Sequence, residues 1–111
     1  DNDKTLSSAG ISNTSVFYHV VASYDYSVKI QKIYINGNLV GTLDNSSEPS
    51  NLYPSNKFYS IGVQGYSNHG GQQIDRNFFD SKISLVKIYN RVLTIDEIKQ
   101  NYNALRGRYG I

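Results

Sequence analysis

The stretch that decides the fold runs from Phe79 to Leu105 and reads FDSKISLVKIYNRVL followed by TIDEIKQNYNAL. Its first half is rich in β-branched and aromatic residues, which fit a pleated, half-buried surface and predict a strand over 79–93. Thr94 and Glu97 then have the spacing of a capping box, in which the hydroxyl and the carboxylate each accept a hydrogen bond from a free backbone N–H group at a helix start. The sequence therefore predicts a long strand that leads directly into a capped helix.

The predicted helix has further signals at both ends. Leu93 before the cap and Ile98 after it have the spacing of a hydrophobic staple. Gly107 predicts the end of the helix, because glycine commonly terminates helices. Between these points, apolar side chains recur at three- and four-residue spacing and form one stripe: Ile95, Ile98, Tyr102 and Leu105.

Length and composition limit the possibilities for the whole chain. It has 111 residues, a net charge of +2, no cysteine and no methionine. The length suits one hydrophobic core, and without cysteine that core depends on burial and backbone pairing alone. Basic residues are dispersed, so we expect no nucleic-acid partner, and no apolar run approaches the ~20 residues of a membrane-spanning helix, so we expect no membrane insertion. Because the chain opens with Asp1 and lacks methionine, we expect it to be a processed product or part of a larger protein.

The remaining sequence predicts short strands separated by polar loops. Asn36-Gly37 lies between two apolar runs, which predicts a two-residue hairpin turn within 28–42. The run 16–24 is apolar on both faces, as expected for a central strand. The other expected elements are an N-terminal arm or loop over 1–15, loops over 44–56 and 65–75, and a strand over 58–63. This pattern favours an antiparallel, all-β architecture with one short C-terminal helix.

Several of these motifs, taken in order, resemble one known family. They are FYHVVASYD at 17–25, IYINGNLVG at 33–41, Ile61-Gly62, and the long stretch from Phe79 through Ile98. These motifs, in this order, resemble those of the laminin-G-like, concanavalin A-like jelly roll. The resemblance implies that residues 16–111 belong to an antiparallel β-sandwich, and that they form the second half of a larger domain. A jelly roll has about eight strands, so we expect another segment of the precursor, or another chain, to complete the sheets.

Aromatic and amide side chains are the candidates for binding a glycan. Tyrosine rings can stack on a sugar ring, and loops on a rigid sandwich commonly carry recognition. Half of the tyrosines would equally suit the core or edge of a sandwich, and both interpretations stay open at this point. The candidate glycan-binding residues are Tyr24, Tyr26, Tyr66, Asn68 and His69.

The family resemblance also suggests a calcium site, and calcium prefers oxygen ligands. No cofactor is required by the sequence, and the carboxylates that would hold calcium are Asp25, Asp75 and Asp80. They show no loop motif with ligand spacing, so the alternative is that they are solvated residues at turns and strand ends. His19 is interpreted as a packed strand histidine and not as a ligand.

Catalysis is not predicted. Glycoside hydrolases need two carboxylates facing one another across a cleft, whereas the only glutamates are Glu48, in a loop, and Glu97, in the capping box. The histidines lack a nucleophile motif. We therefore expect a non-enzymatic structural or adhesion module, at a virion or cell surface and within a large oligomeric assembly, since the ending at 88–98 resembles phage and viral particle versions of the family. The alternative is a carbohydrate-binding domain attached to a secreted polysaccharide-degrading enzyme.

Overall fold

The computed structural model describes residues 11, 13–47, 61–62, 64–67, 73–76 and 78–111. The chain divides into two compact units. The first contains Asp1–Pro49 and Tyr89–Ile111, and the second contains Ser50–Ile88. The predicted arm at 1–15 and the predicted loop at 44–56 lie mostly outside the described residues, as does most of the predicted strand at 58–63.

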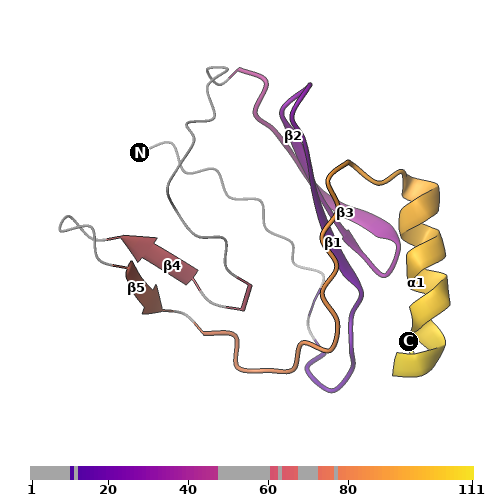
Figure 1. Cartoon of the computed structure of the whole chain (residues 1–111). Coiled ribbons are helices and arrows are strands. Elements are labelled where there is room, and N and C mark those ends of the chain that lie inside the picture. The colour runs from indigo at the N-terminus through magenta and orange to yellow at the C-terminus, as the bar shows by residue number, and fades with distance from the viewer. Residues whose placement is uncertain (1–10, 12, 48–60, 63, 68–72, 77) are drawn as a thin grey trace. The chain divides into compact units, whose positions relative to one another are not determined.

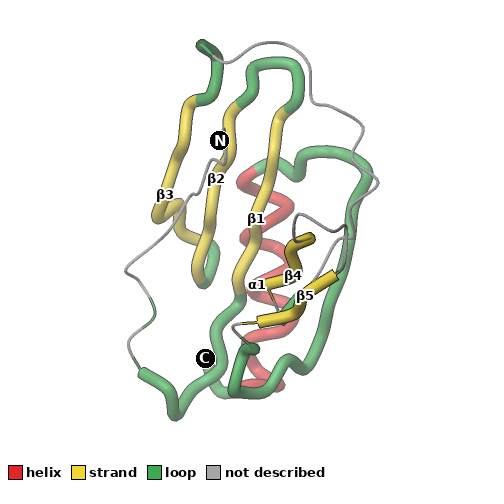
Figure 2. Tube along the Cα trace, turned by 90° about the vertical axis from the view of Figure 1, so that its left-hand side faces the viewer, coloured by secondary structure: helices red, strands yellow, loops and turns green. Residues whose placement is uncertain are grey.

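The first unit is built on a three-stranded antiparallel sheet in the order β1-β2-β3 (Figures 1 and 2). The strands are β1 (Val20–Asp25), β2 (Ile30–Ile35) and β3 (Asn38–Asp44). Antiparallel pairing agrees with the predicted all-β architecture, although a complete two-sheet sandwich is not present in the described residues. The strand predicted over 16–24 is present with other bounds, because β1 begins at Val20 and ends at Asp25. It lies at one edge of the described sheet, and its central position in a sandwich stays a prediction.

The hairpin predicted at Asn36-Gly37 is confirmed. Asn36 has φ 49° and Gly37 has φ 80°, so both central residues are left-handed, as a two-residue turn between twisted strands requires. The Asn36 side chain also accepts a hydrogen bond from the backbone N–H of His19 at 2.9 Å, which ties the turn to the chain entering β1. The turn therefore joins three segments of the unit.

Gly37→Ala is expected to destabilise the chain by about 1–2 kcal/mol, since a left-handed φ is costly for a residue with a Cβ atom. The new Cβ would also lie 3.3 Å from Cδ2 of Tyr102. Gly107→Ala is the matched control, because Gly107 lies within a helix and a Cβ there meets nothing within 4 Å. It is expected to stabilise by about 0.5–1 kcal/mol. Denaturant unfolding of both variants in the full-length precursor measures the difference, and equal effects would contradict the turn geometry.

The helix α1 (Ile95–Tyr109) begins as predicted. Thr94 Oγ1 accepts a hydrogen bond from the Glu97 backbone N–H at 3.2 Å, and Glu97 Oε1 accepts one from the Thr94 backbone N–H at 3.0 Å. The predicted end was wrong, because the helix continues through Gly107 and stops at Gly110, which has φ 67° and is left-handed. The final backbone N–H groups explain the difference, since those of Gly110 and Ile111 both donate to the Arg106 carbonyl.

The helix packs on one face of the sheet through a small core. Ile98 is fully buried against Tyr34 of β2 and Leu93, and Val21 of β1 packs beside them. Leu93 and Ile98 are thus the two halves of the predicted staple. Toward the other end of the helix, the rings of His19 and Tyr102 lie 5.9 Å apart. His19 therefore lies beside an aromatic ring, as predicted, but the prediction that it is a strand residue was wrong, because it precedes β1.

An ion pair that the sequence did not reveal reinforces the helix start. Arg91 donates two hydrogen bonds to the Glu97 carboxylate, at 2.7 and 2.5 Å. These bonds from Arg91, followed by the bond from the Thr94 backbone, lower the pKa of Glu97 from its ordinary 4.5 to about 2. Glu97 is consequently charged throughout the neutral and mildly acidic range.

This lowered pKa predicts an acid-sensitive helix start. A carboxyl group whose pKa is lower in the folded state stabilises that state above its unfolded pKa, and the stabilisation is lost as the pH falls toward the folded pKa. The contribution of Glu97 should therefore decline between pH 4.5 and about 2. Circular dichroism at 222 nm against pH measures it. Glu97→Gln keeps the capping geometry but cannot titrate, so it should lose less helix in this range than the wild type does; identical curves would contradict the prediction.

The second unit contains a two-stranded antiparallel pair, β4 (Gln64–Ser67) and β5 (Gln73–Arg76). This corrects the predicted loop at 65–75, where polar composition concealed a pairing that depends on backbone hydrogen bonds. The strand predicted over 79–93 was also wrong, because residues 78–93 form no ladder among the described residues. Strand-forming side chains alone do not make a strand, since a neighbouring strand must supply the hydrogen bonds.

Candidate functional site

The candidate site lies where β1 turns into β2. Asp25 ends β1, and its Oδ1 accepts hydrogen bonds from the backbone N–H of Ser27 at 3.0 Å and from the Ser27 hydroxyl at 2.6 Å. The Ser27 hydroxyl is the main cause of a lowered pKa at Asp25, and the charge of Lys32 contributes less. Lys29 completes the four-residue turn with φ 57°. The turn therefore holds an ionised carboxylate at the end of the sheet.

Strand register places a hydroxyl and an ammonium group beside this carboxylate. Ser23 pairs directly with Lys32, and Asp25 pairs with Ile30, so all four side chains lie on the same face of the sheet. Tyr34 follows on this face, two residues beyond Lys32. The polar groups of Ser23, Asp25 and Lys32 therefore form one cluster on the face that also carries the helix.

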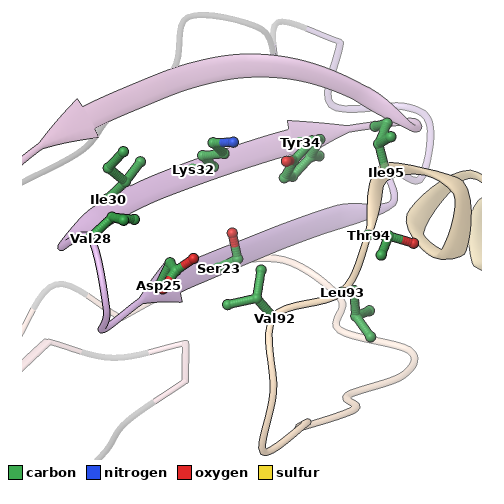
Figure 3. A pocket seen from close by; sticks show the side chains of 10 residues that line it. All are labelled: Ser23, Asp25, Val28, Ile30, Lys32, Tyr34, Val92, Leu93, Thr94 and Ile95. Atoms are coloured by element: carbon green, nitrogen blue, oxygen red, sulfur yellow. The ribbon is translucent and has the colours of Figure 1, made fainter.

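The cluster lines a pocket of about 250 Å³ that is drawn in Figure 3. The sheet and its turn supply one side of the pocket, and the chain entering α1 supplies the other. Leu93, which is buried, and Thr94, the N-cap residue of α1, hold that second side in place. The lining residues are Ser23, Asp25, Val28, Ile30, Lys32, Tyr34, Val92, Leu93, Thr94 and Ile95.

The structure separates the predicted glycan residues. Tyr24 is half-buried on β1 and points to the face opposite the pocket, whereas Tyr26 is 61% exposed in the turn. Tyr66 lies on β4, in the second unit. Asn68 and His69 lie outside the described residues. Tyr24 and Tyr26 are therefore adjacent to the pocket in sequence without lining it, and a platform made of all five residues stays a prediction.

The predicted calcium ligands are distributed in the same way. Asp25 belongs to the first unit, while Asp75 on β5 and the exposed Asp80 belong to the second. In the part of the chain that the structure describes, no three acidic or histidine side chains gather as a metal site would require. Ser27 already occupies one oxygen of Asp25. Calcium binding through these residues remains a prediction.

The sequence did not predict that Ser23, Lys32 and the segment 92–95 line a pocket. The alternation of strand residues gives the face of each side chain once the register is known. The Asn36-Gly37 turn fixes the register of β2 with β3, but the four-residue turn after Asp25 fixes that of β1 with β2. The sequence signal for that turn is Asp25 followed two residues later by Ser27, a spacing typical of a side-chain-capped turn.

Comparison with known proteins identifies the family of this chain. A family model described as the concanavalin A-like lectin/glucanases superfamily matches residues 1–99. The chain belongs to this superfamily. The match confirms the resemblance at the level of the superfamily, and the superfamily's name covers both lectins and glucanases. No curated protein and no solved structure matches the chain. Within the described residues, no helix of this superfamily member is long and apolar enough to cross a membrane.

Proposed function

We propose that this concanavalin A-like chain is a non-enzymatic structural or adhesion module of a larger assembly at a virion or cell surface, and that it binds glycans there. Membership of a superfamily of lectins and glucanases supports a carbohydrate-binding or structural role. The resemblance of the ending at 88–98 to particle proteins supports the location. Fold membership alone does not establish a function.

The observation that best supports an interface is the number of apolar side chains that are exposed. Among the described residues, four apolar side chains are buried and eighteen large ones are exposed. Soluble monomers rarely leave large contiguous apolar patches in water, and such patches commonly mark interfaces. The extended run from Ile83 to Ile88 contributes four of the exposed side chains, and Ile88 is 85% exposed. These four exposed apolar side chains within six residues support association with another segment or chain.

We propose that the remaining strands of the sandwich cover these exposed side chains. β1 is an edge strand of the described sheet, and the run at 83–88 has the composition of a strand but no ladder. In the first unit, a strand from the same precursor would supply backbone hydrogen bonds to β1, since unpaired edges readily accept a further strand. In the second unit, another such strand would cover the apolar side chains of the run at 83–88. Other copies or chains of the assembly would then attach to the completed sandwich.

The hydrogen bonds of Glu97 support the non-enzymatic proposal. Both of its oxygens accept hydrogen bonds from Arg91, and one also accepts from the Thr94 backbone. Its low pKa keeps it ionised, which suits a structural ion pair and not a general acid. The pocket carries the single carboxylate Asp25, whereas a hydrolase needs a pair.

Two measurements on the intact protein test this proposal. A glycan array reports sugar binding, and co-purification with the native particle or full-length precursor reports incorporation. We expect both to be positive. Incorporation without any glycan binding would leave the structural role and eliminate the lectin role. A catalytic domain in the same precursor would instead favour the carbohydrate-binding domain of a polysaccharide-degrading enzyme.

A further inference from the structure

The pocket beside β1 and β2 combines three polar groups of different kinds on one face of the sheet. Ser23 and Lys32 are cross-strand partners, so their Cβ atoms are about 5 Å apart, and Asp25 lies diagonally from Lys32 at about 7–8 Å. A hydroxyl, an ammonium and a carboxylate are therefore available within the width of one small ligand. Thr94 adds the edge of the capped turn on the opposite side.

The charges in this cluster restrict the ligand. A carboxylate offers about four acceptor positions, of which Ser27 uses two and the Val28 backbone N–H contributes to a third, so Asp25 can accept one further hydrogen bond. Lys32 can only donate, and Ser23 can do both. Asp25 would repel an anionic ligand and Lys32 a cationic one. An uncharged ligand with neighbouring hydroxyl groups satisfies all three, because each hydroxyl both donates and accepts.

The rest of the lining is apolar. Val28 and Val92 are each close to half exposed, and Ile30 lies directly opposite Asp25 on the neighbouring strand. A sugar ring has this same division, with hydroxyl groups at its rim and C–H groups on its face. The volume of about 250 Å³ is below the range of drug-sized pockets and suits a single ring.

We propose that this pocket, between the helix-bearing face of β1 and β2 and the chain at Val92–Ile95, binds one uncharged sugar ring through adjacent hydroxyl groups. Asp25 accepts from one hydroxyl, Lys32 donates to its neighbour, and Ser23 bridges them. This inference rests on the proposed glycan-binding function and assigns its site to a face that Tyr24 does not share.

The test uses the intact protein in its native precursor or assembly, with the methyl glycosides of glucose, galactose and mannose as probes. Titration calorimetry measures affinity, and hydrogen–deuterium exchange maps the contact. We expect slower exchange in peptides covering 20–34 and 90–96 when the preferred glycoside is present. Lys32→Ala and Asp25→Asn should each weaken binding by tenfold or more, as expected for a lost hydrogen bond to a charged group.

Gln31→Ala is the matched control, because Gln31 lies on β2 but on the opposite face. It should leave the affinity unchanged. Glycoside binding that is unaffected by the Lys32 and Asp25 substitutions would overturn the assigned site while leaving the glycan-binding function intact. Binding of no glycan, on these probes or on the array, would overturn both. The exchange map of the wild-type protein decides the location even if a variant fails to fold.

Discussion

Ile98→Ala is expected to cause the largest loss of stability of any single substitution in the helix, about 3–4 kcal/mol in the free energy of unfolding. Ile98 is 0% exposed and lies at the centre of the contact between α1 and the sheet, against Tyr34 and Leu93. Truncating a buried isoleucine removes apolar contacts and leaves a cavity. Because the described core of this unit is so small, few other contacts can compensate.

Ile95→Ala is the control for this substitution. It removes the same atoms from the same helix, but Ile95 is 41% exposed, so the expected loss is below about 1.5 kcal/mol. Denaturant unfolding of the full-length precursor, followed by far-ultraviolet circular dichroism, compares the two variants. If Ile98→Ala were no more harmful than Ile95→Ala, the helix would not depend on the packing described above.

Ile88→Asp is expected to have the largest effect on assembly. Ile88 is 85% exposed, so a carboxylate there should leave the folding of the chain itself almost unchanged. If the run at 83–88 is covered by the rest of the sandwich, the same carboxylate would be buried without a partner, which is costly. We expect incorporation into the precursor's complete domain or the native particle to fall by at least tenfold, a loss typical of a substituted interface anchor.

Ile88→Leu is the control for Ile88→Asp, since it keeps an apolar side chain of similar volume and should incorporate normally. Quantitative co-purification with the assembly measures both variants. Normal incorporation of Ile88→Asp would mean that this run stays in water and would remove the main support for the proposed interface.

The sequence predicted the elements whose signals are local. The capping box depends on two residues three positions apart, Thr94 and Glu97, and the hairpin on the adjacent pair Asn36-Gly37. Both are present as predicted. The end of the helix was less predictable, because glycine costs only about 1 kcal/mol inside a helix. Gly107 is therefore tolerated, and the backbone bonds to Arg106 determine that Gly110 ends the helix.

Elements that depend on distant pairing were predicted poorly. The composition of 79–93 is that of a strand, but a strand exists only beside another one. For the same reason, residues 65–75 were predicted to be a loop, although polar residues there pair as β4 and β5. The binding pocket was missed for a related reason, since Ser23 and Lys32 become neighbours only through the register that the turn after Asp25 imposes.

We propose that another segment or chain completes the sandwich to which this chain belongs. The oligomeric state and folding cooperativity of residues 1–111 alone test this proposal most directly. Sedimentation velocity with parallel denaturant unfolding provides both quantities. We predict self-association or a broad, weakly cooperative transition for the isolated chain, and a single sharp transition for the full-length precursor. A monodisperse, cooperatively folded monomer of residues 1–111 would contradict the claim.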